Sequence, residues 1–251
     1  MKLARLSLLL ISTCVFSLVT IGMAAPVAAP VPDSGMTPPC TAAMQASIPA
    51  CPLTGCGNGG DAFLNEAKNR SDALTGPTTM SLDQIRALSQ PSNWPTGSPR
   101  ESIQGPGKEG SPVVVKAFLL KAKAEGAESC NCGLTKRVDT DIHLVLVSKL
   151  PDLDDQDEVD NAEAGSVTAE ITPRVRRNGH ANWVHKNVND FEGEFVRLTG
   201  RLMLDTKHLP PNRKLRRATN WEVHPITRFQ VCQTTKAKCD QSTGAPNWKV
   251  F

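Results

Sequence analysis

The sequence predicts a mainly β chain built on a five-stranded, OB-fold-like Greek-key barrel, preceded by a largely irregular N-terminal arm with short helices. Three observations support this fold class. Residues 112–232 contain five segments with strand signals, the middle three alternate apolar and polar side chains, and the interval after the third is long enough for a short helix. Five strands with a helix between the third and fourth is the layout of an OB-fold, whereas a two-sheet sandwich needs seven or more strands.

The first residues of the chain have the pattern of a secretory signal peptide. Lys2 and Arg5 precede an apolar run, and small residues then lead to a cleavage site after Ala24, so the predicted signal peptide is residues 1–24. The apolar run of about 16 residues is short for a bilayer span, which needs roughly 20, and no second such run follows. The sequence therefore predicts a secreted or periplasmic protein with no transmembrane segment after signal removal.

Residues 25–111 form the predicted N-terminal arm. The segment is rich in Pro, Gly, Ser, Thr and Ala, and it has two plausible helices, one after Asp61 and one after Ser81, which are both good N-cap residues. Because such a composition buries little apolar surface, we expect a loosely packed extension. Residues 55–60 have the G-x-G-x-x-G spacing of nucleotide-binding loops, but no buried strand precedes them, which favours a disulfide-tethered turn.

The cysteine count indicates an oxidising compartment and an incomplete set of disulfides. Seven cysteines follow the signal peptide, so at least one thiol is free or paired between chains. Cys232 and Cys239 form the one pair that we predict, closing a short loop after the last strand. The Cys-x-Cys of Cys130 and Cys132 is either a strained, redox-active ring or, as we favour, two separate ties of this loop to the arm or a neighbouring strand.

The barrel is predicted to span residues 112–232, and residues 233–251 form a C-terminal tail. The five strands are expected at 112–124, 139–150, 166–175, 194–205 and 219–232. Gly200 interrupts the fourth strand and predicts a bulge that lets a small sheet close on itself. Between the third and fourth strands, Trp183, Val184, Val188 and Phe191 are the apolar residues expected to plug one end of the barrel.

Net charge selects no partner, but basic residues gather in three predicted loops or strand ends. The formal charge of +3 falls to +1 without the signal peptide, which removes two basic residues and no acidic ones. OB-folds bind ligands with the loops between strands one and two and strands four and five. The basic candidates at these places and at the end of strand three are Lys136, Arg137, Arg174, Arg176, Arg213, Lys214, Arg216 and Arg217.

A polyanion lying across the barrel would meet all of these basic residues, with salt-dependent affinity. The alternative is a merely solvated basic loop. The chain has no Tyr and few other aromatic residues on which bases could stack, and the acidic segment 152–163, expected as a solvated loop, would repel a phosphate backbone.

Two histidines and two glutamates are candidates for a metal site. Glu222 and His224 alternate with the apolar residues of the last strand, and His143 and Glu170 occupy the corresponding face of the second and third strands. In an OB-fold these strands are neighbours, so the four side chains could meet on the barrel exterior and bind a divalent metal such as zinc. The alternative is that Glu222 and His224 face Arg197 or Arg201 of the fourth strand and only neutralise a surface.

Two resemblances complete the sequence evidence. The order of elements, with an export signal, is similar to the secreted bacterial OB-fold family of periplasmic proteins over residues 112–232. The strings SCNCG, DTDIHL, RLTGRLMLD and TNWEVHPIT resemble uncharacterised exported bacterial proteins. The periplasmic family is shorter and lacks the cysteine-bearing arm, and neither resemblance implies an activity.

Three functions follow as hypotheses. The first is a secreted, non-enzymatic OB-fold binding module without a cofactor, whose partner is an anionic polymer or surface such as a nucleic acid or polysaccharide. The second is a metal-dependent hydrolase or nuclease that uses the His/Glu cluster. The third is a structural protein that interacts with the cell envelope. The sequence predicts no particular oligomeric state.

Overall fold

The computed structural model describes residues 34–209, 216–242, 244 and 246–251, so the predicted signal peptide lies outside the described residues. Within these ranges the chain is mainly β, with seven strands in one sheet and several short helices. No helix in the described ranges has the length and apolar character needed to cross a membrane.

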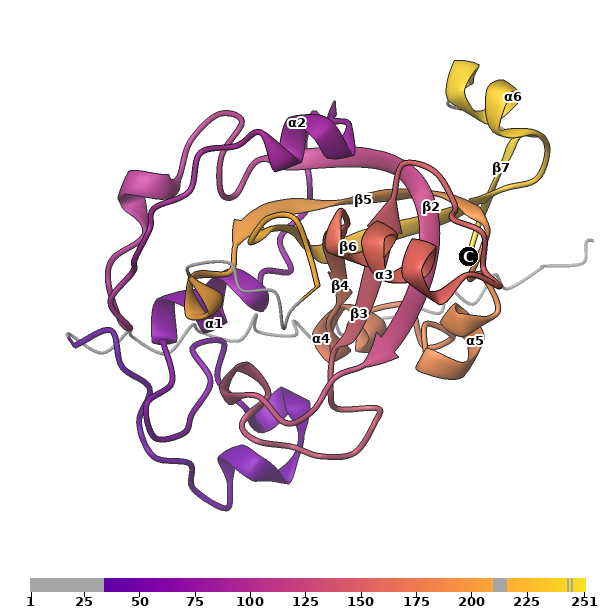
Figure 1. Ribbon diagram of the computed structural model, residues 1–251. Coiled ribbons are helices and arrows are strands. Elements are labelled where there is room, and N and C mark those ends of the chain that lie inside the picture. Colours follow the sequence, from indigo (N-terminus) through magenta and orange to yellow (C-terminus); the bar gives the residue numbers. More distant parts are fainter. Residues whose placement is uncertain (1–33, 210–215, 243, 245) are drawn as a thin grey trace, which may run out of the picture.

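Five of the strands close into a barrel (Figure 1). They are β2 (Pro112–Ala124), β3 (Ile142–Val147), β4 (Val167–Ile171), β5 (Phe195–Leu204) and β6 (Trp221–Cys232). Strand β2 pairs antiparallel with β3 and β5, β3 pairs with β4, β4 runs parallel to β6, and β6 pairs antiparallel with β5, which completes the ring. The predicted fold class, a mainly β chain with a five-stranded barrel, is confirmed.

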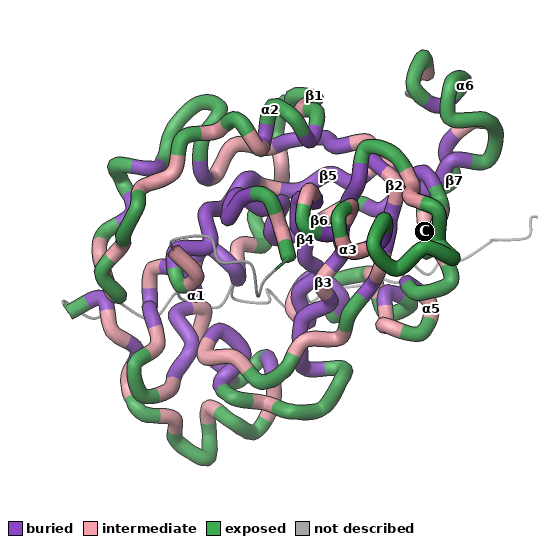
Figure 2. Tube along the Cα trace, viewed as in Figure 1, coloured by how far each residue is buried: buried purple, intermediate pink, exposed green. Residues whose placement is uncertain are grey.

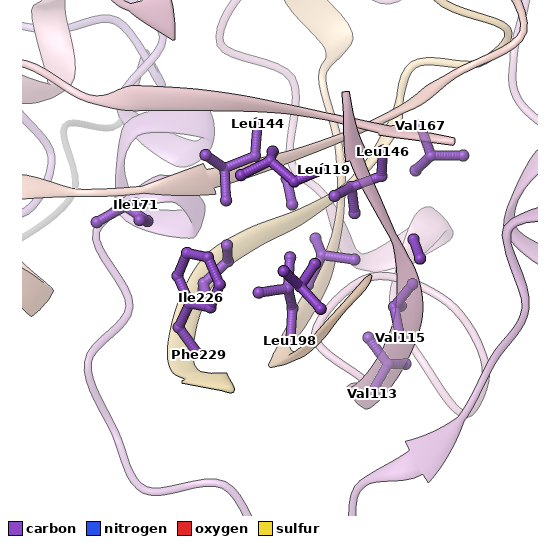
Figure 3. Close-up of a cluster of buried hydrophobic side chains, with 14 of the residues drawn as sticks. Val113, Val115, Leu119, Leu144, Leu146, Val167, Ile171, Leu198, Ile226 and Phe229 are labelled. Atoms are coloured by element: carbon purple, nitrogen blue, oxygen red, sulfur yellow. The ribbon is translucent and has the colours of Figure 1, made fainter. Parts of the chain in front are cut away.

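The barrel interior is the apolar core predicted from the alternation of side chains. Inward-facing side chains from all five strands meet there, among them Val115, Leu144, Ile171, Leu198 and Phe229 (Figure 3). Each is at most 1% exposed, and burying a side chain of this size stabilises the fold by about 1.5–3 kcal/mol.

The segment between β4 and β5 contributes three of the four predicted apolar residues to the core. Trp183 and Val188 are fully buried in the core cluster, and Phe191 packs against it, whereas Val184 is only partly buried and outside the cluster. Two short helices lie in this segment, α4 (Pro173–Arg177) and α5 (His185–Asn189).

The predicted third strand is too long. Strand β4 ends at Ile171, because the side chain of Thr172 accepts a hydrogen bond from the backbone of Val175 and Pro173 occupies the first helical position, where its missing N–H costs nothing. Arg174 and Arg176 therefore lie on helix α4 and not at a strand end.

Gly200 allows the close contact between β5 and β6. The pairing register shifts on both sides of Gly200, which confirms the predicted bulge. A Cβ atom at this position would lie 2.6 Å from the backbone oxygen of Pro225 and 2.8 Å from a methyl carbon of Val223.

The substitution Gly200→Ala is therefore expected to lower the free energy of unfolding by about 1–3 kcal/mol, because a backbone atom must move to admit the methyl group. Urea unfolding of the purified protein measures this change. Gly126→Ala is the matched control, since nothing lies within 4 Å of a Cβ at Gly126. Equal stability of the two variants would contradict the close contact.

The N-terminal arm wraps around one side of the barrel (Figure 1). Its elements are the 3-10 turns η1 (Met44–Ala46), η2 (Ile48–Ala50) and η3 (Glu101–Ile103), the helices α1 (Ala62–Lys68) and α2 (Leu82–Arg86), and the short strand β1 (Thr78–Thr79), which pairs with β2. Asp61 caps α1 and Ser81 caps α2, as predicted.

The arm is irregular but more tightly packed than we predicted from its composition. Ile48, Leu64 and Ile85 are at most 3% exposed, and Leu82 and Ile85 belong to the barrel's core cluster. Buried stretches alternate with exposed ones along the arm (Figure 2). The few apolar residues of the arm pack on the barrel, so the arm needs no core of its own.

Three disulfides connect described cysteines: Cys40 with Cys56, Cys51 with Cys132, and Cys232 with Cys239. The last confirms the predicted pair. The second ties the arm to the turn η4 (Ser129–Asn131), which precedes β3. Cys130 is buried and has no disulfide partner among the described residues.

The remaining elements lie outside the barrel wall. The acidic segment after β3, predicted as a solvated loop, forms helix α3 (Gln156–Ala164), with Asp155 as its N-cap. The turn η5 (Thr206–His208) follows β5. In the C-terminal tail, α6 (Lys236–Gln241) precedes β7 (Trp248–Val250), which pairs with β6.

Candidate metal centre

Polar side chains from three neighbouring strands meet on the outer face of the barrel wall. His224 comes from β6, Glu170 from β4, and Asp141 from the residue before β3. The His224 Nδ1 atom lies 3.1 Å from Glu170 Oε2 and 3.5 Å from Glu222 Oε2, and the Nε2 atom lies 3.6 Å from Asp141 Oδ2. One imidazole ring thus has a carboxylate oxygen close to each nitrogen.

These close atoms have no hydrogen-bond partners. Both ring nitrogens of His224 and one carboxylate oxygen each of Asp141, Glu170 and Glu222 are buried without a hydrogen bond. They lie within ion-pair distance but are not aligned for hydrogen bonding. An unsatisfied buried polar atom costs about 1–3 kcal/mol, so five such atoms on four neighbouring residues require an explanation.

A divalent cation bound by Asp141, Glu170 and one ring nitrogen of His224 would satisfy three of these five atoms. Ligand atoms of Asp141, Glu170 and His224 all lie within 4.8 Å of one another. Metal bonds to His nitrogen or carboxylate oxygen are about 2.0–2.2 Å long, so two ligands of one cation lie roughly 3–4.4 Å apart. The three residues fit a site of one histidine and two carboxylates.

The sequence predicted part of this cluster. Glu170, Glu222 and His224 do converge, and His143 pairs directly with Glu170 in the register of β3 and β4. The His143 side chain lies at the rim, with Nδ1 3.2 Å from Glu125 Oε1 and 3.9 Å from Glu170 Oε1, and with Nε2 2.9 Å from Thr168 Oγ1. His143 has other partners and is not one of the three converging ligands.

The cluster lies on the outer face of the barrel wall, but the arm covers this face. Glu222 and His224 are at most 1% exposed and Glu170 is 6% exposed. Lys68 of α1 donates a hydrogen bond of 2.9 Å to Glu128, which immediately precedes η4, and both residues lie over the cluster. Sequence periodicity could not reveal this cover, because it comes from irregular segments.

Glu222 is held by an arginine that we predicted as a ligand-binding residue. The Arg217 guanidinium donates to Glu222 Oε1 and, over 2.6 Å, to Asp205 Oδ2, and its Nε donates over 3.1 Å to Asn220. His208 contacts the same Asp205 oxygen at 2.5 Å. The alternative interpretation required Glu222 to face Arg197 or Arg201. Glu222 instead pairs with Arg217.

Negative charge exceeds positive charge around His224. Burial and the negative charge of Glu128 raise the pKa of Asp141 above its ordinary value. Burial, together with Glu222 and Asp141, raises the pKa of Glu170 well above the ordinary value, against the attraction of Lys68. Ionising either of these two carboxyl groups is therefore unfavourable, and binding a proton or a metal cation would neutralise the charge.

Three charged residues around the centre are stabilised in their ionised forms. Burial opposes the charge on Glu128, but Lys68 outweighs it and lowers the pKa of Glu128 to about 2. Burial also opposes the charge on Lys68, and the nearby carboxylates, Glu128 first, hold its pKa well above the ordinary value. For Glu222, the charge of Arg217 outweighs burial and lowers the pKa. The pair of Lys68 and Glu128 that covers the cluster is thus ionised on both sides.

A cleft of about 180 Å³ opens beside the cluster. Lys68 and Glu128 line it together with Asn65, Trp94 and Lys207. The indole N–H of Trp94 is buried without a hydrogen-bond partner. The cleft therefore offers two ammonium groups and an unused N–H donor next to the candidate metal centre.

Most of the predicted basic ligand-binding residues point elsewhere. Arg174 donates to the backbone oxygens of Cys51 and Pro52, and Arg176 donates to backbone oxygens of the segment before β3, including Thr140. Arg216 forms an ion pair with Asp160. Lys136 and Arg137 are exposed, and Arg213 and Lys214 lie outside the described residues.

Sequence reasoning missed four residues of this region: Lys68, Glu128, Cys130 and Asp141. Asp141 had a signal, because it lies two residues before His143 and shares its face. Cys130 stood out in the Cys-x-Cys string, but nothing placed it near the cluster. Lys68 and Glu128 had no signal, since their place depends on how the arm packs against the barrel.

Comparison with protein-family models, curated proteins and solved structures finds no match. The resemblance to secreted periplasmic OB-fold proteins therefore stays a prediction. The function is argued from the geometry of the cluster.

Proposed function

We propose that the chain is an exported metal-dependent hydrolase that binds a divalent cation with Asp141, Glu170 and His224. The observation that carries this proposal is the convergence of buried ligand atoms that have no hydrogen-bond partner. Three protein ligands leave coordination positions for water, and a bound cation lowers the pKa of such a water toward neutrality. The three disulfides are consistent with export to an oxidising compartment.

The surrounding residues have defined tasks in this proposal. Arg217 fixes Glu222, which keeps a carboxylate next to His224 Nδ1. Lys68 and Lys207 place positive charge in the adjacent cleft, and Trp94 adds an N–H donor. Asp61 and Glu128 line the same cleft, so the formal charges of its lining balance. We take phosphate esters as the substrate class to test first, because a divalent cation and Lys207 would both attract their oxygens.

The anionic-polymer module, favoured by the sequence, is less well supported by this geometry. It relied chiefly on the basic loop with Arg213, Lys214, Arg216 and Arg217, and Arg213 and Lys214 lie outside the described residues. Arg217 lies in buried ion pairs, and Arg174 and Arg176 donate to backbone oxygens. Among the described candidates, Arg216, Lys136 and Arg137 are exposed.

Metal content and hydrolysis test the proposal together. We expect the purified protein to contain a transition metal by elemental analysis, and to hydrolyse p-nitrophenyl phosphate or bis(p-nitrophenyl) phosphate in a chelator-sensitive manner. Glu170→Gln should weaken metal binding by at least about 100-fold, because even residues that only support metal ligands contribute about 10–100-fold. Glu125→Gln, at the partly exposed rim beside His143, should keep both metal and activity.

Glu170→Gln should also change the melting temperature in opposite directions without and with metal. An ion-pair network that binds no metal would not give this reversal. In the metal-free protein the variant should have a higher melting temperature than the wild type, because it removes a buried charge whose pKa is raised. With metal present, the order should reverse. A protein that neither contains nor binds a transition metal would refute the proposal, and metal without any hydrolysis would refute the hydrolase part alone.

A further inference from the structure

Cys130 lies beside the candidate metal centre and is the described cysteine without a disulfide. The Cys130 Sγ atom lies 3.4 Å from Glu128 Oε2, and the residue is 1% exposed. Its neighbour Cys132 is tied to Cys51, and Cys132 has a left-handed backbone conformation with φ of 52°. The Cys-x-Cys string therefore has one structural cysteine, which anchors the turn, and one thiol held facing acidic groups.

The thiol belongs to a second group of candidate ligands. Ligand atoms of Glu128, Cys130 and Asp141 all lie within 4.8 Å of one another, as do those of Asp141, Glu170 and His224. Asp141 is common to both groups. Its Oδ1 accepts a hydrogen bond of 3.0 Å from Asn131, and its Oδ2 is buried with no hydrogen-bond partner. This oxygen, 3.6 Å from His224 Nε2, is buried where the two groups meet, and a cation on either side could use it.

We propose that the centre holds two cations, and that the second is bound by Glu128, the thiolate of Cys130 and Asp141, which bridges the two positions. This inference rests on the proposed function, because it extends the same centre. A carboxylate bridge places two cations about 3.5–4 Å apart in hydrolytic enzymes, where they act jointly on one substrate. A thiolate ligand selects a thiophilic cation such as zinc over magnesium or calcium.

Charge at the second position fits this assignment. Burial and the charge of Glu128 raise the pKa of the Cys130 thiol. Lys68 supplies the positive charge beside this position, with its ammonium 2.9 Å from Glu128. A cation bound by Cys130 would replace the thiol proton, which would pass to solvent.

Cobalt(II) substitution tests the inference on the full-length mature protein. A cobalt–thiolate bond gives a ligand-to-metal charge-transfer absorption in the near ultraviolet, which oxygen and nitrogen ligands do not give. We expect two cobalt ions per chain and this absorption in the wild type. Cys130→Ser should keep one cobalt ion and lose the absorption. Ser129→Ala, a neighbouring change in the same turn, should keep two ions and the absorption.

The outcomes separate the inference from the proposed function. One cobalt ion without the absorption in the wild type would overturn the second position and leave the first intact. One ion with the absorption would also overturn it, because Cys130 would then ligate the first cation. No bound cobalt would refute the proposed function itself. If Cys130→Ser does not fold, Cys130→Ala gives the same comparison.

Discussion

Replacing Arg217 by methionine is expected to lower the free energy of unfolding by about 3–5 kcal/mol, which is the usual cost of breaking a buried ion pair. The guanidinium is 4% exposed and neutralises both Asp205 and Glu222. Methionine keeps much of the length of the side chain but leaves two buried carboxylates without their partner. Urea unfolding at pH 7 measures the loss.

Arg216→Met is the matched control, because the Arg216 side chain is 49% exposed and its pair with Asp160 lies at the surface. Such pairs contribute about 0–1 kcal/mol. A loss below about 1 kcal/mol in both variants would show that Arg217 is a solvated charge, as the hypothesis of a basic binding loop requires.

The effect of Arg217 should also depend on pH. Burial opposes the charge on Asp205, but His208 and Arg217 outweigh burial and hold the pKa of Asp205 below its ordinary value. A carboxylate with a lowered pKa stabilises the fold above its unfolded pKa, and this contribution is lost as the pH falls through the folded value. The difference in stability between wild type and Arg217→Met should therefore narrow below about pH 4, where unfolded carboxyl groups take up protons. An unchanged difference at low pH would contradict this cause.

Replacing Cys51 and Cys132 together by serine is the second large prediction. The bridge closes a loop with a sequence separation of 81 residues. In the loop-entropy description, the lost entropy of the unfolded chain raises the free energy of unfolding by about 4.5 kcal/mol, which the double replacement should remove. The Cys232–Cys239 bridge spans 7 residues, so the same double replacement there should cost only about 2.5 kcal/mol. Thermal or urea unfolding of the two double variants compares the costs.

The two disulfides should also differ in their effect on the metal centre. The Cys51–Cys132 bridge holds the turn that carries Cys130 and is preceded by Glu128, whereas the Cys232–Cys239 bridge lies near the chain end in a separate cluster with Phe195 and Trp248. Loss of the first should weaken metal binding, and loss of the second should leave it unchanged. Equal metal affinity in both variants would show that the turn keeps its place without the bridge.

The barrel could be predicted from the sequence because its strands carry local signals. The apolar residues of β2 and the alternation in β5 placed these strands to within a residue, and Gly200 marked the bulge. The end of β4 was missed because Thr172 and Pro173 begin a helix, and the preceding alternation gives no warning of it. Periodicity describes strand interiors better than strand ends.

The candidate site was predicted only in part, because half of it depends on contacts between distant segments. Glu170, Glu222 and His224 follow from which strand faces are neighbours in the barrel. Whether Arg217 faces solvent or two carboxylates depends on how β5 and β6 pair, and a list of charges cannot show this. Lys68 reaches the cluster through the arm, and Glu128 through the turn that a disulfide ties to the arm, and this disulfide pattern could not be read from seven cysteines.

The parallel contact between β4 and β6 would give the proposed cation a second, structural role. Only two residue pairs join these strands, Thr168 with Glu222 and Ala169 with Val223, whereas eight pairs join β5 and β6. Glu170 and His224 lie on opposite sides of this short seam, next to its paired residues. A cation bound by both residues would link β4 to β6 where the barrel strands share the fewest backbone pairs. The cation proposed to activate water would then also stabilise the closed barrel. Chelation should then speed amide hydrogen exchange along β4 and the first half of β6 before it affects the β5–β6 ladder.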